Sequence, residues 1–368
     1  MRVRNSVGEF TKIAVVLNTP AQVHLFRNII DGLQKDGHEV LILARRYGDT
    51  LELLSEFALD ARVFADGDGR KFSKIASVPN HLYGMCKILR PYKPDVVIGS
   101  GADSAVVSWL MKASGILFND SEPIPAQLLV MKLTSDAILT PSCFRADLGK
   151  NHVRVDTYKE LAYLHPNHFS PDTSILHSIG ISPGERYGIL RFNGFKAIHD
   201  LGITGFSIAE KRRLAETLGQ RMRVFVSSET PLPADLEKLA IRLPKSKIHD
   251  LIAHASLVVA DTQTIVTEAA VLGTPAVRFN GFVGDGDMGN FIELQRKYDM
   301  IYSFSNSSDA ISKAIQLAEI DDVKREWERK RQVLLRDKVD LTQFMIEFIE
   351  RYPESKFNAL HHGCPENS

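Results

Sequence analysis

Residues 257–281 combine a buried strand, a tight turn and a helix in an arrangement that could bind a phosphate. Leu257 to Ala260 is a short apolar run typical of a buried parallel strand, and residues 262–272 carry apolar side chains at helical spacing. The turn between them leaves backbone N–H groups at a helix N-terminus, where the partial positive charge favours an anion. We predict a phosphate site formed by Asp261, Thr262, Gln263 and Thr264.

Glu268 lies further along the same predicted helix, within reach of a hydroxyl group beside such a phosphate. The alternative is a solvated carboxylate or a capping partner of Thr264. The neighbouring Ala269 and Ala270 indicate a closely packed helix, in which an unused charge would be costly. We therefore expect Glu268 to accept hydrogen bonds from a ligand.

A second group of candidates follows two other strands of the same half. Arg191 ends the apolar run 187–192, where a guanidinium could bind a phosphate through two hydrogen bonds, although a surface ion pair would explain it equally well. Ser227, Ser228 and Glu229 end another strand and either line the same pocket or form a simple turn.

Acid–base candidates lie in the first half of the chain. His24 falls just inside the first predicted helix, on the side where open parallel sheets bind ligands, and an imidazole titrates near neutral pH. Packing at the edge of the apolar face is the alternative. Asp103 and Glu122 come from loops on the same side. Each could serve as a base, orient His24 or cap a helix.

The elements that position these residues alternate between strand and helix. The expected strands cover 12–17, 39–44, 61–65, 95–99, 116–119, 137–140 and 156–158 in the first half, and 187–192, 223–227, 246–248, 257–260, 276–279 and 301–304 in the second. Such alternation predicts parallel sheets covered on both faces. We therefore predict an α/β fold of two doubly wound, Rossmann-like domains.

A stretch with prolines and glycines but no strand-like run separates the two halves. We predict an N-terminal domain over 1–168, a linker region over 169–183, a C-terminal domain over 184–336, and a C-terminal helix and tail over 337–368. The C-terminal helices are expected to pack back on the first domain.

Composition restricts the function classes. The 368 residues suffice for two domains, and Lys plus Arg balance Asp plus Glu at 45 each, so no bulk charge favours nucleic acid. The three cysteines lack the spacing of a disulfide framework or a zinc site. No run approaches the length of a membrane span. These features predict a cytoplasmic protein without a transmembrane segment.

Several common motifs are missing. There is no GxGxxG opening a strand–helix unit, no GxxxxGK[ST] and no GxSxG, so nicotinamide chemistry, P-loop hydrolysis and serine hydrolysis lose support. The glycine-rich loop 281–290 lacks the ligand register of a calcium loop. We predict no metal site, and we expect that loop to face a sugar, with Asn290 as a contact.

The order of the motifs resembles the GT-B superfamily of nucleotide-sugar enzymes, and within it a widespread prokaryotic family of predicted glycosyltransferases. The matching residues are Asn18-Thr-Pro20 with Val23-His24-Leu-Phe26, Gly37-His38-Glu-Val40, Lys93-Pro94-Asp95, Glu160-Leu-Ala-Tyr163-Leu-His165-Pro166, Ser227-Ser-Glu229, Lys247-Ile-His249-Asp250-Leu251 and Glu268-Ala-Ala-Val-Leu-Gly-Thr-Pro275. More distantly, residues 261–275 are similar to the donor site of UDP-N-acetylglucosamine 2-epimerase and of the lipid-linked N-acetylglucosaminyltransferase of cell-wall synthesis.

This resemblance implies two domains facing a cleft and a metal-independent transfer, as in polysaccharide biosynthesis. A sugar would pass from a nucleotide-diphosphate sugar, expected to be UDP-linked, to a saccharide or lipid-linked acceptor. It also implies that Glu268 binds the ribose and that the backbone at Ile248 and His249 holds the base. No cofactor is implied. The apolar run 82–89, with basic residues nearby, is compatible with peripheral membrane contact or with core packing.

One departure from the family pattern keeps two other functions open. Related families have glycines before the donor-site helix, where this chain has Thr262-Gln263-Thr264, and glycine would let a phosphate approach the backbone closely. The first alternative is a sugar-nucleotide 2-epimerase, which shares the donor residues but needs no acceptor. The second is a protein that binds nucleotides or carbohydrates without catalysis.

Overall fold

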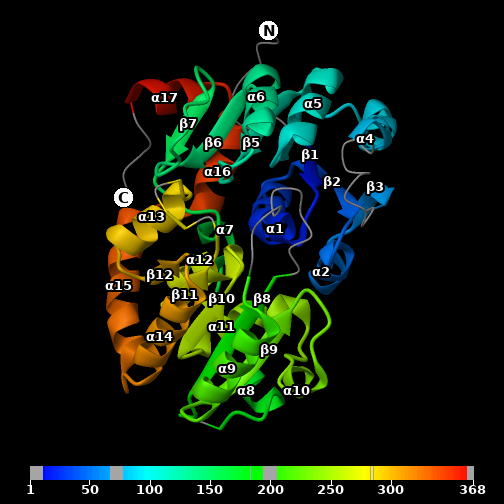
Figure 1. Cartoon of the computed structure of the whole chain (residues 1–368). Coiled ribbons are helices and arrows are strands. Elements are labelled where there is room, and N and C mark those ends of the chain that lie inside the picture. The colour runs from blue at the N-terminus through cyan, green and yellow to red at the C-terminus, as the bar shows by residue number, and fades with distance from the viewer. Residues whose placement is uncertain are drawn as a thin grey trace. The chain divides into compact units, whose positions relative to one another are not determined.

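The computed structural model describes residues 11–66, 78–182, 184–193, 205–281, 283–284 and 286–362. The chain forms two compact units (Figure 1). Unit 1 comprises residues 1–168 and 338–368, and unit 2 comprises residues 169–337. Each unit contains a parallel sheet with helices on both faces.

The described part of unit 1 contains a seven-stranded sheet in the order β3-β2-β1-β4-β5-β6-β7, parallel throughout. Its strands are β1 Lys12–Leu17, β2 Glu39–Arg46, β3 Ala61–Asp66, β4 Val96–Gly99, β5 Ser114–Phe118, β6 Ala137–Pro141 and β7 His152–Val155. The strand expected over 156–158 is wrong. The last strand, β7, ends at Val155, and the backbone N–H of Thr157 donates to the Val155 carbonyl in a turn.

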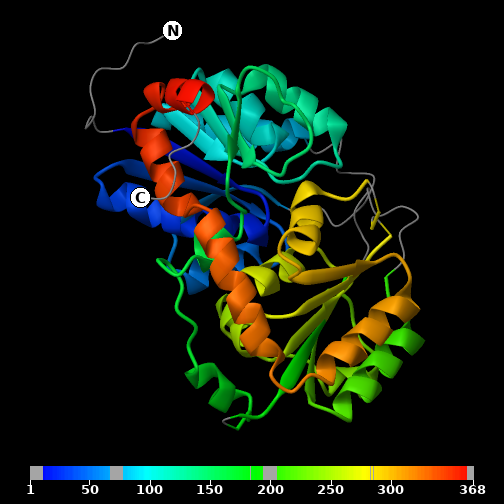
Figure 2. The same ribbon diagram turned by 90° about the vertical axis from the view of Figure 1, so that its left-hand side faces the viewer.

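Helices cover both faces of this sheet (Figure 2). They are α1 Pro20–Lys35, α2 Thr50–Glu56, α4 Val78–Tyr92, α5 Ala102–Met111, α6 Pro125–Thr134, α7 Leu161–Leu164, α16 Leu341–Glu350 and α17 Glu354–His362. Right-handed crossovers put α1 and α2 on one face and α4 and α5 on the other, because the chain moves in opposite directions from the centre of the sheet. Met85, Leu89 and Val107 pack with Ala14 and Val16 on the second face.

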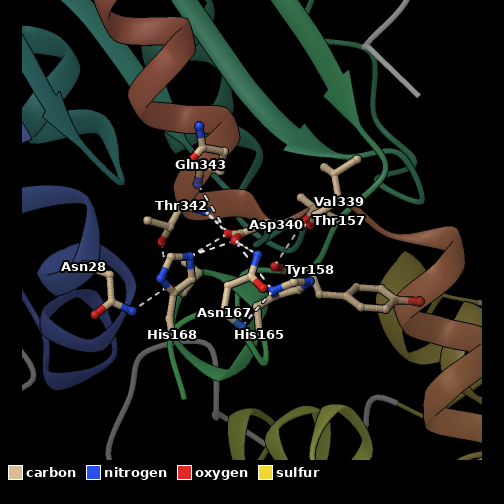
Figure 3. A network of polar contacts seen from close by, with 11 residues as sticks. Asn28, Thr157, Tyr158, His165, Asn167, His168, Val339, Asp340, Thr342 and Gln343 are labelled. Atoms are coloured by element: carbon tan, nitrogen blue, oxygen red, sulfur yellow. Dashed lines mark hydrogen bonds and ion pairs between the residues drawn. The ribbon is translucent and has the colours of Figure 1, made fainter. Parts of the chain in front are cut away.

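The C-terminal helices pack on unit 1, as expected from the sequence. Asp340 caps α16 by accepting the backbone N–H of Thr342, and His168 Nε2 lies 2.8 Å from its carboxylate (Figure 3). Asn167 donates to the same carboxylate at 3.0 Å. Burial opposes ionisation of Asp340, but the hydrogen bonds from His168 and Asn167 outweigh it and hold its pKa below the ordinary value. A partly buried hydrogen-bond network therefore fixes the start of α16.

Unit 2 contains a parallel sheet of five described strands in the order β12-β11-β10-β8-β9. These are β8 Tyr187–Phe192, β9 Arg223–Ser228, β10 Leu257–Ala260, β11 Ala276–Phe279 and β12 Ile301–Phe304. The helices are α8 Ser174–Ser178, α9 Ile208–Gly219, α10 Ala234–Glu237, α11 Ile248–His254, α12 Thr264–Val271, α13 Gly289–Arg296, α14 Ser307–Ala318 and α15 Val323–Asp337.

One detail of unit 2 differs from the expectations. The strand expected over 246–248 is wrong: Lys245–Lys247 form the 3₁₀ helix η2 after Pro244, and α11 follows at once. In the expected linker region, Asp172 donates its backbone N–H to Asp250 at 2.8 Å. Among the described residues, no helix is long and apolar enough to cross a membrane.

Candidate functional site

Each sheet reverses its strand order once, between β1 and β4 in unit 1 and between β8 and β10 in unit 2. Open α/β sheets bind ligands beyond the carboxyl ends of the strands at such a switch point. Asp103 follows β4, Arg191 ends β8, and the turn over 261–264 follows β10. The topology therefore places the strongest sequence candidates at the two switch points.

Arg191 lies on one face of the sheet in unit 2, in register with Ala260 of β10 and Ser227 of β9. Its guanidinium donates to Ser227 Oγ at 2.6 Å and to Glu229 Oε1 at 2.8 Å. The ion pair expected as the alternative is thus present, and its Arg191 side chain is 28% exposed. Of the neighbouring candidates, Ser228 accepts the backbone N–H of Thr230, as in a simple turn.

The turn after β10 leads directly into α12, whose N-terminal cap is Gln263. No residue over 261–264 has a positive φ, and φ at Gln263 is −93°, so this backbone needs no glycine. The first N–H groups of a helix have no acceptor within it. Thr262 Oγ1 is buried and has no hydrogen-bond partner among the described residues. The turn therefore presents a helix N-terminus and an unsatisfied hydroxyl.

Asp261 faces the protein's own backbone. It is fully buried, with Oδ1 accepting the N–H of Asn193 at 2.6 Å and Oδ2 accepting that of Phe206 at 3.2 Å. Burial raises its pKa to about 6, although both hydrogen bonds act in the opposite direction. Both carboxylate oxygens thus tie the end of β10 to neighbouring backbone.

Glu268 and His249 form a buried pair between α12 and α11. His249 Nε2 lies 2.9 Å from Glu268 Oε1, and the two residues are 1% and 7% exposed. Phe169 packs edge-on against the imidazole. Ile248, the first residue of α11, is half-buried. The motif residues of α11 and α12, which lie 19 positions apart, are thus brought into direct contact.

The structure adds Arg278 of β11, which the sequence reasoning missed. Arg278 is fully buried, pairs with Asp287 and lies 3.8 Å from the ring centroid of Phe291. Its Nε and Nη1 have no hydrogen-bond partner within the described part of the chain. Asn290, expected to contact a sugar, instead accepts the backbone N–H of Phe291. A charged residue inside the apolar run 276–279 was the available signal for Arg278.

The switch point of unit 1 is built around Asp103. The half-buried carboxyl group accepts the backbone N–H of Ser104 at 2.8 Å and a hydrogen bond from the Asn18 side chain. Desolvation raises the pKa of Asp103 and outweighs these hydrogen bonds and the nearby His81, which lower it. Gln22 accepts the Asn18 N–H and donates to Ser100, which joins the ends of β1 and β4. The group can therefore exchange a proton nearer neutral pH than an ordinary aspartate.

The other two acid–base candidates have different neighbours. His24 is 7% exposed, and its ring packs against Phe57 and Tyr163, with centroids 5.6 and 5.4 Å away. Glu122 accepts the backbone N–H of Arg145 at 2.9 Å. No group of three His, Cys, Asp or Glu side chains in the described ranges could hold a metal ion. Of the three candidates, the geometry favours Asp103 for acid–base chemistry.

Comparison with known proteins bears on the fold. Residues 11–159 match a family model described as "Protein of unknown function (DUF354)", while no curated protein sequence matches the chain. The S. aureus MnaA–UDP co-structure has 10% identity and a TM-score of 0.69, covering 98% of this chain and 100% of that one.

Two further structures show the same similarity. UDP-GlcNAc 2-epimerase from Neisseria meningitidis, bound to UDP-GlcNAc, has 14% identity and a TM-score of 0.66, covering 92% of this chain and 99% of that one. Spinosyn forosaminyltransferase SpnP has 12% identity and a TM-score of 0.61, and the similarity covers 95% of this chain and 100% of that one. The expected α/β fold of GT-B type, with two Rossmann-like sheets, is therefore confirmed.

Proposed function

We propose that this protein is a glycosyltransferase that binds a nucleotide-diphosphate sugar at the switch point of unit 2 and transfers the sugar to an acceptor hydroxyl. One observation carries the proposal: the buried Thr262 hydroxyl has no hydrogen-bond partner among the described residues, in the turn between β10 and α12, and β10 pairs with the strand that carries Arg191. An unsatisfied buried donor is costly, and a phosphate oxygen would satisfy it. The nucleotides named in the related structures, UDP and UDP-GlcNAc, support a UDP-linked donor.

In this scheme the cations and dipoles of unit 2 stabilise the departing diphosphate. The helix N-terminus and Arg191 would interact with charge that develops as the glycosidic bond breaks. Because Arg191 already supplies a positive charge, the scheme needs no metal ion. Glu268, held by His249, would accept hydrogen bonds from the ribose.

Unit 1 would supply the base. We assign it to Asp103, whose raised pKa suits removal of a proton from an acceptor hydroxyl, and not to His24, which packs between two aromatic rings. The proton passes from the hydroxyl to the Asp103 carboxylate as the acceptor oxygen attacks the sugar.

A thermal-shift screen with UDP, GDP, ADP, dTDP and their sugars tests the donor assignment. A ligand that binds only the folded protein raises the melting temperature, and we expect the largest rise with a UDP-sugar. Glu268→Gln keeps a hydrogen-bonding partner for His249 but weakens ribose binding, so it should reduce the rise. Glu328→Gln, an exposed carboxylate on α15, is the control. A screen without any shift would contradict the proposal.

The second candidate is 2-epimerisation of a UDP-N-acetylhexosamine. It is supported by the full-length similarity to the Neisseria epimerase, which matches both units of this chain. Incubation with UDP-GlcNAc alone separates the two activities. Inversion at C2 without an acceptor would establish the epimerase, whereas transfer that requires an acceptor would establish the glycosyltransferase.

A further inference from the structure

The helices α4, α5 and α6 of unit 1 lie side by side (Figure 1). Each of them exposes large apolar side chains to solvent. We name this surface the apolar patch; it consists of Tyr83 on α4, Trp109 and Leu110 on α5, and Leu129 and Leu133 on α6. Their exposed fractions run from 44% for Leu110 to 73% for Leu133. Single exposed apolar residues are normal, but a group on adjacent helices marks an interaction site.

The apolar patch is separate from the core that holds these helices in place. α5 packs between α4 and α6. Met85 and Val107 are buried against the sheet from one side of α4 and α5, as is Met131 from α6. Leu129 and Leu133, one turn apart on α6, point away from that core. The helices are thus apolar on two sides, and packing within unit 1 explains only one of them.

The exposed charged residues carried by these three helices are all basic. Lys87, Arg90, Lys112 and Lys132 are exposed on or directly after the same helices. Asp103 is the one acidic residue within α4, α5 and α6, and it is bonded to Ser104 at the start of α5.

Acidic residues also lie in the segments that adjoin these helices, and each has a partner within unit 1. Asp95, Glu122, Asp136 and Asp147 accept backbone N–H groups, and Asp120 pairs with Lys159. The three helices and the residue after α5 thus carry four exposed cations and no exposed acidic residue.

We propose that the apolar patch docks unit 1 on the surface of a membrane containing anionic lipids. Aromatic side chains such as Trp109 and Tyr83 favour the boundary between headgroups and acyl chains, and flanking lysines and arginines are attracted to anionic headgroups. A second copy of the chain is a poorer occupant. A twofold interface would bring the four cations of one copy against the same four of the other.

Vesicle co-sedimentation of the full chain tests this proposal without reference to catalysis. One set of vesicles contains phosphatidylcholine alone, and the other contains phosphatidylcholine with about 30% of the anionic lipid phosphatidylglycerol. We expect sedimentation with the anionic vesicles, weakened by salt, and little with the neutral ones. Loss of nucleotide binding would leave this result unchanged, so the two proposals fail independently.

Two double variants locate the contact. Trp109→Ser with Leu133→Ser should lower the partition coefficient about tenfold or more, because each buried methylene contributes to membrane affinity. Lys112→Gln with Lys132→Gln should lower it about 25-fold, at about fivefold per charge. The control is Ile320→Ser with Val333→Ser, which removes two exposed apolar residues from unit 2 and should leave partitioning unchanged.

Three results would overturn the proposal. The first is the absence of sedimentation with anionic vesicles at low salt. The second is wild-type partitioning of the Trp109→Ser, Leu133→Ser variant. The third is a dimer in sedimentation velocity that this variant converts to a monomer, without vesicle binding by the wild type. That last result would assign the apolar patch to a second copy of the chain.

Discussion

The switch points of the two units share a topology and an aspartate with a raised pKa, but they differ in how that aspartate is used. In unit 1, β4 leads through Gly101 into α5, and in unit 2, β10 leads through Gln263 into α12. Burial raises the pKa of Asp103 after the first turn and of Asp261 in the second. A raised pKa therefore marks both turns without distinguishing their roles.

The hydrogen-bond partners make the distinction. Both oxygens of Asp261 accept backbone N–H groups, from Asn193 and Phe206, so its carboxyl group is committed to holding the fold. Asp103 is half-buried and bonds to Ser104 and to a side chain, Asn18. We infer that unit 1 uses its aspartate for chemistry, whereas unit 2 uses its turn for binding. The following predictions test that contrast.

The largest effect is expected from Asp103→Asn. If Asp103 is the base, kcat should fall about 100- to 10,000-fold, while the donor Kd changes little. In the wild type, activity should rise with pH through an apparent pKa above 3.8, because the base must be ionised. The measurement is a pH–rate profile with the best donor found. An Asp103→Asn enzyme with wild-type kcat would remove the contrast between the two aspartates.

Asp261→Asn should change stability rather than chemistry. The folded pKa of about 6 lies above the ordinary value of 3.8, so the protonated form of Asp261 stabilises the folded state. Its contribution to the free energy of unfolding is fully present below pH 3.8. This contribution is lost as the pH rises through 6. The free energy of unfolding of the wild type minus that of the variant should thus be about 2 kcal/mol larger at pH 4.5 than at pH 7.5. Urea unfolding at both pH values measures it, and equal gaps would contradict this role.

Arg191→Gln should weaken donor binding by about 10- to 100-fold, since hydrogen bonds to charged groups contribute about 1.5–3 kcal/mol. The matched control is Arg212→Gln, because Arg212 also pairs with a carboxylate of unit 2, Asp235, at 2.6 Å. Calorimetric titration with the donor nucleotide separates them. Equal losses in both variants would show that Arg191 acts only as a surface ion pair.

The smallest effect concerns the backbone of the two turns. Gly101, the N-cap of α5, has φ of +119°, and a Cβ there would lie 3.3 Å from Asp103 Oδ1. Gly101→Ala should therefore cost about 1–3 kcal/mol of unfolding free energy. Gln263→Ala, at the equivalent N-cap of α12, should cost less than about 1 kcal/mol. Similar costs at the two positions would mean that the turns are not conformationally different.

The sequence predicted the fold well because both sheets are parallel. Buried runs such as 257–260 are short, continuously apolar and followed by turn residues, so the alternation of strands and helices is visible without a structure. The error at 246–248 arose where only three residues carried the signal. Side-chain partners were harder to foresee. The contact of His24 with Tyr163 joins residues more than 100 positions apart, and the contact with Phe57 joins two separate elements, so no local pattern records either one.

Whether the turn at Thr262-Gln263-Thr264 needs glycine could also be answered only from the structure. From the sequence, Thr262-Gln263-Thr264 in place of glycines weakened the expectation of a phosphate site. The negative φ at Gln263 shows that this backbone needs no glycine, and the unpartnered Thr262 hydroxyl supplies a donor in its place. Neither dihedral angles nor unsatisfied hydroxyls can be read from residue types.

The most direct test of the central claim is calorimetric titration of UDP into the wild type, Thr262→Val and Thr267→Val. Both threonines have a buried hydroxyl without a partner among the described residues, so neither variant should destabilise the fold. If a diphosphate binds at the turn, Thr262→Val should weaken UDP about fivefold, the value of one hydrogen bond, and Thr267→Val should leave its affinity unchanged. Equal affinities of the wild type and Thr262→Val, or no binding of UDP by the wild type, would contradict the claim.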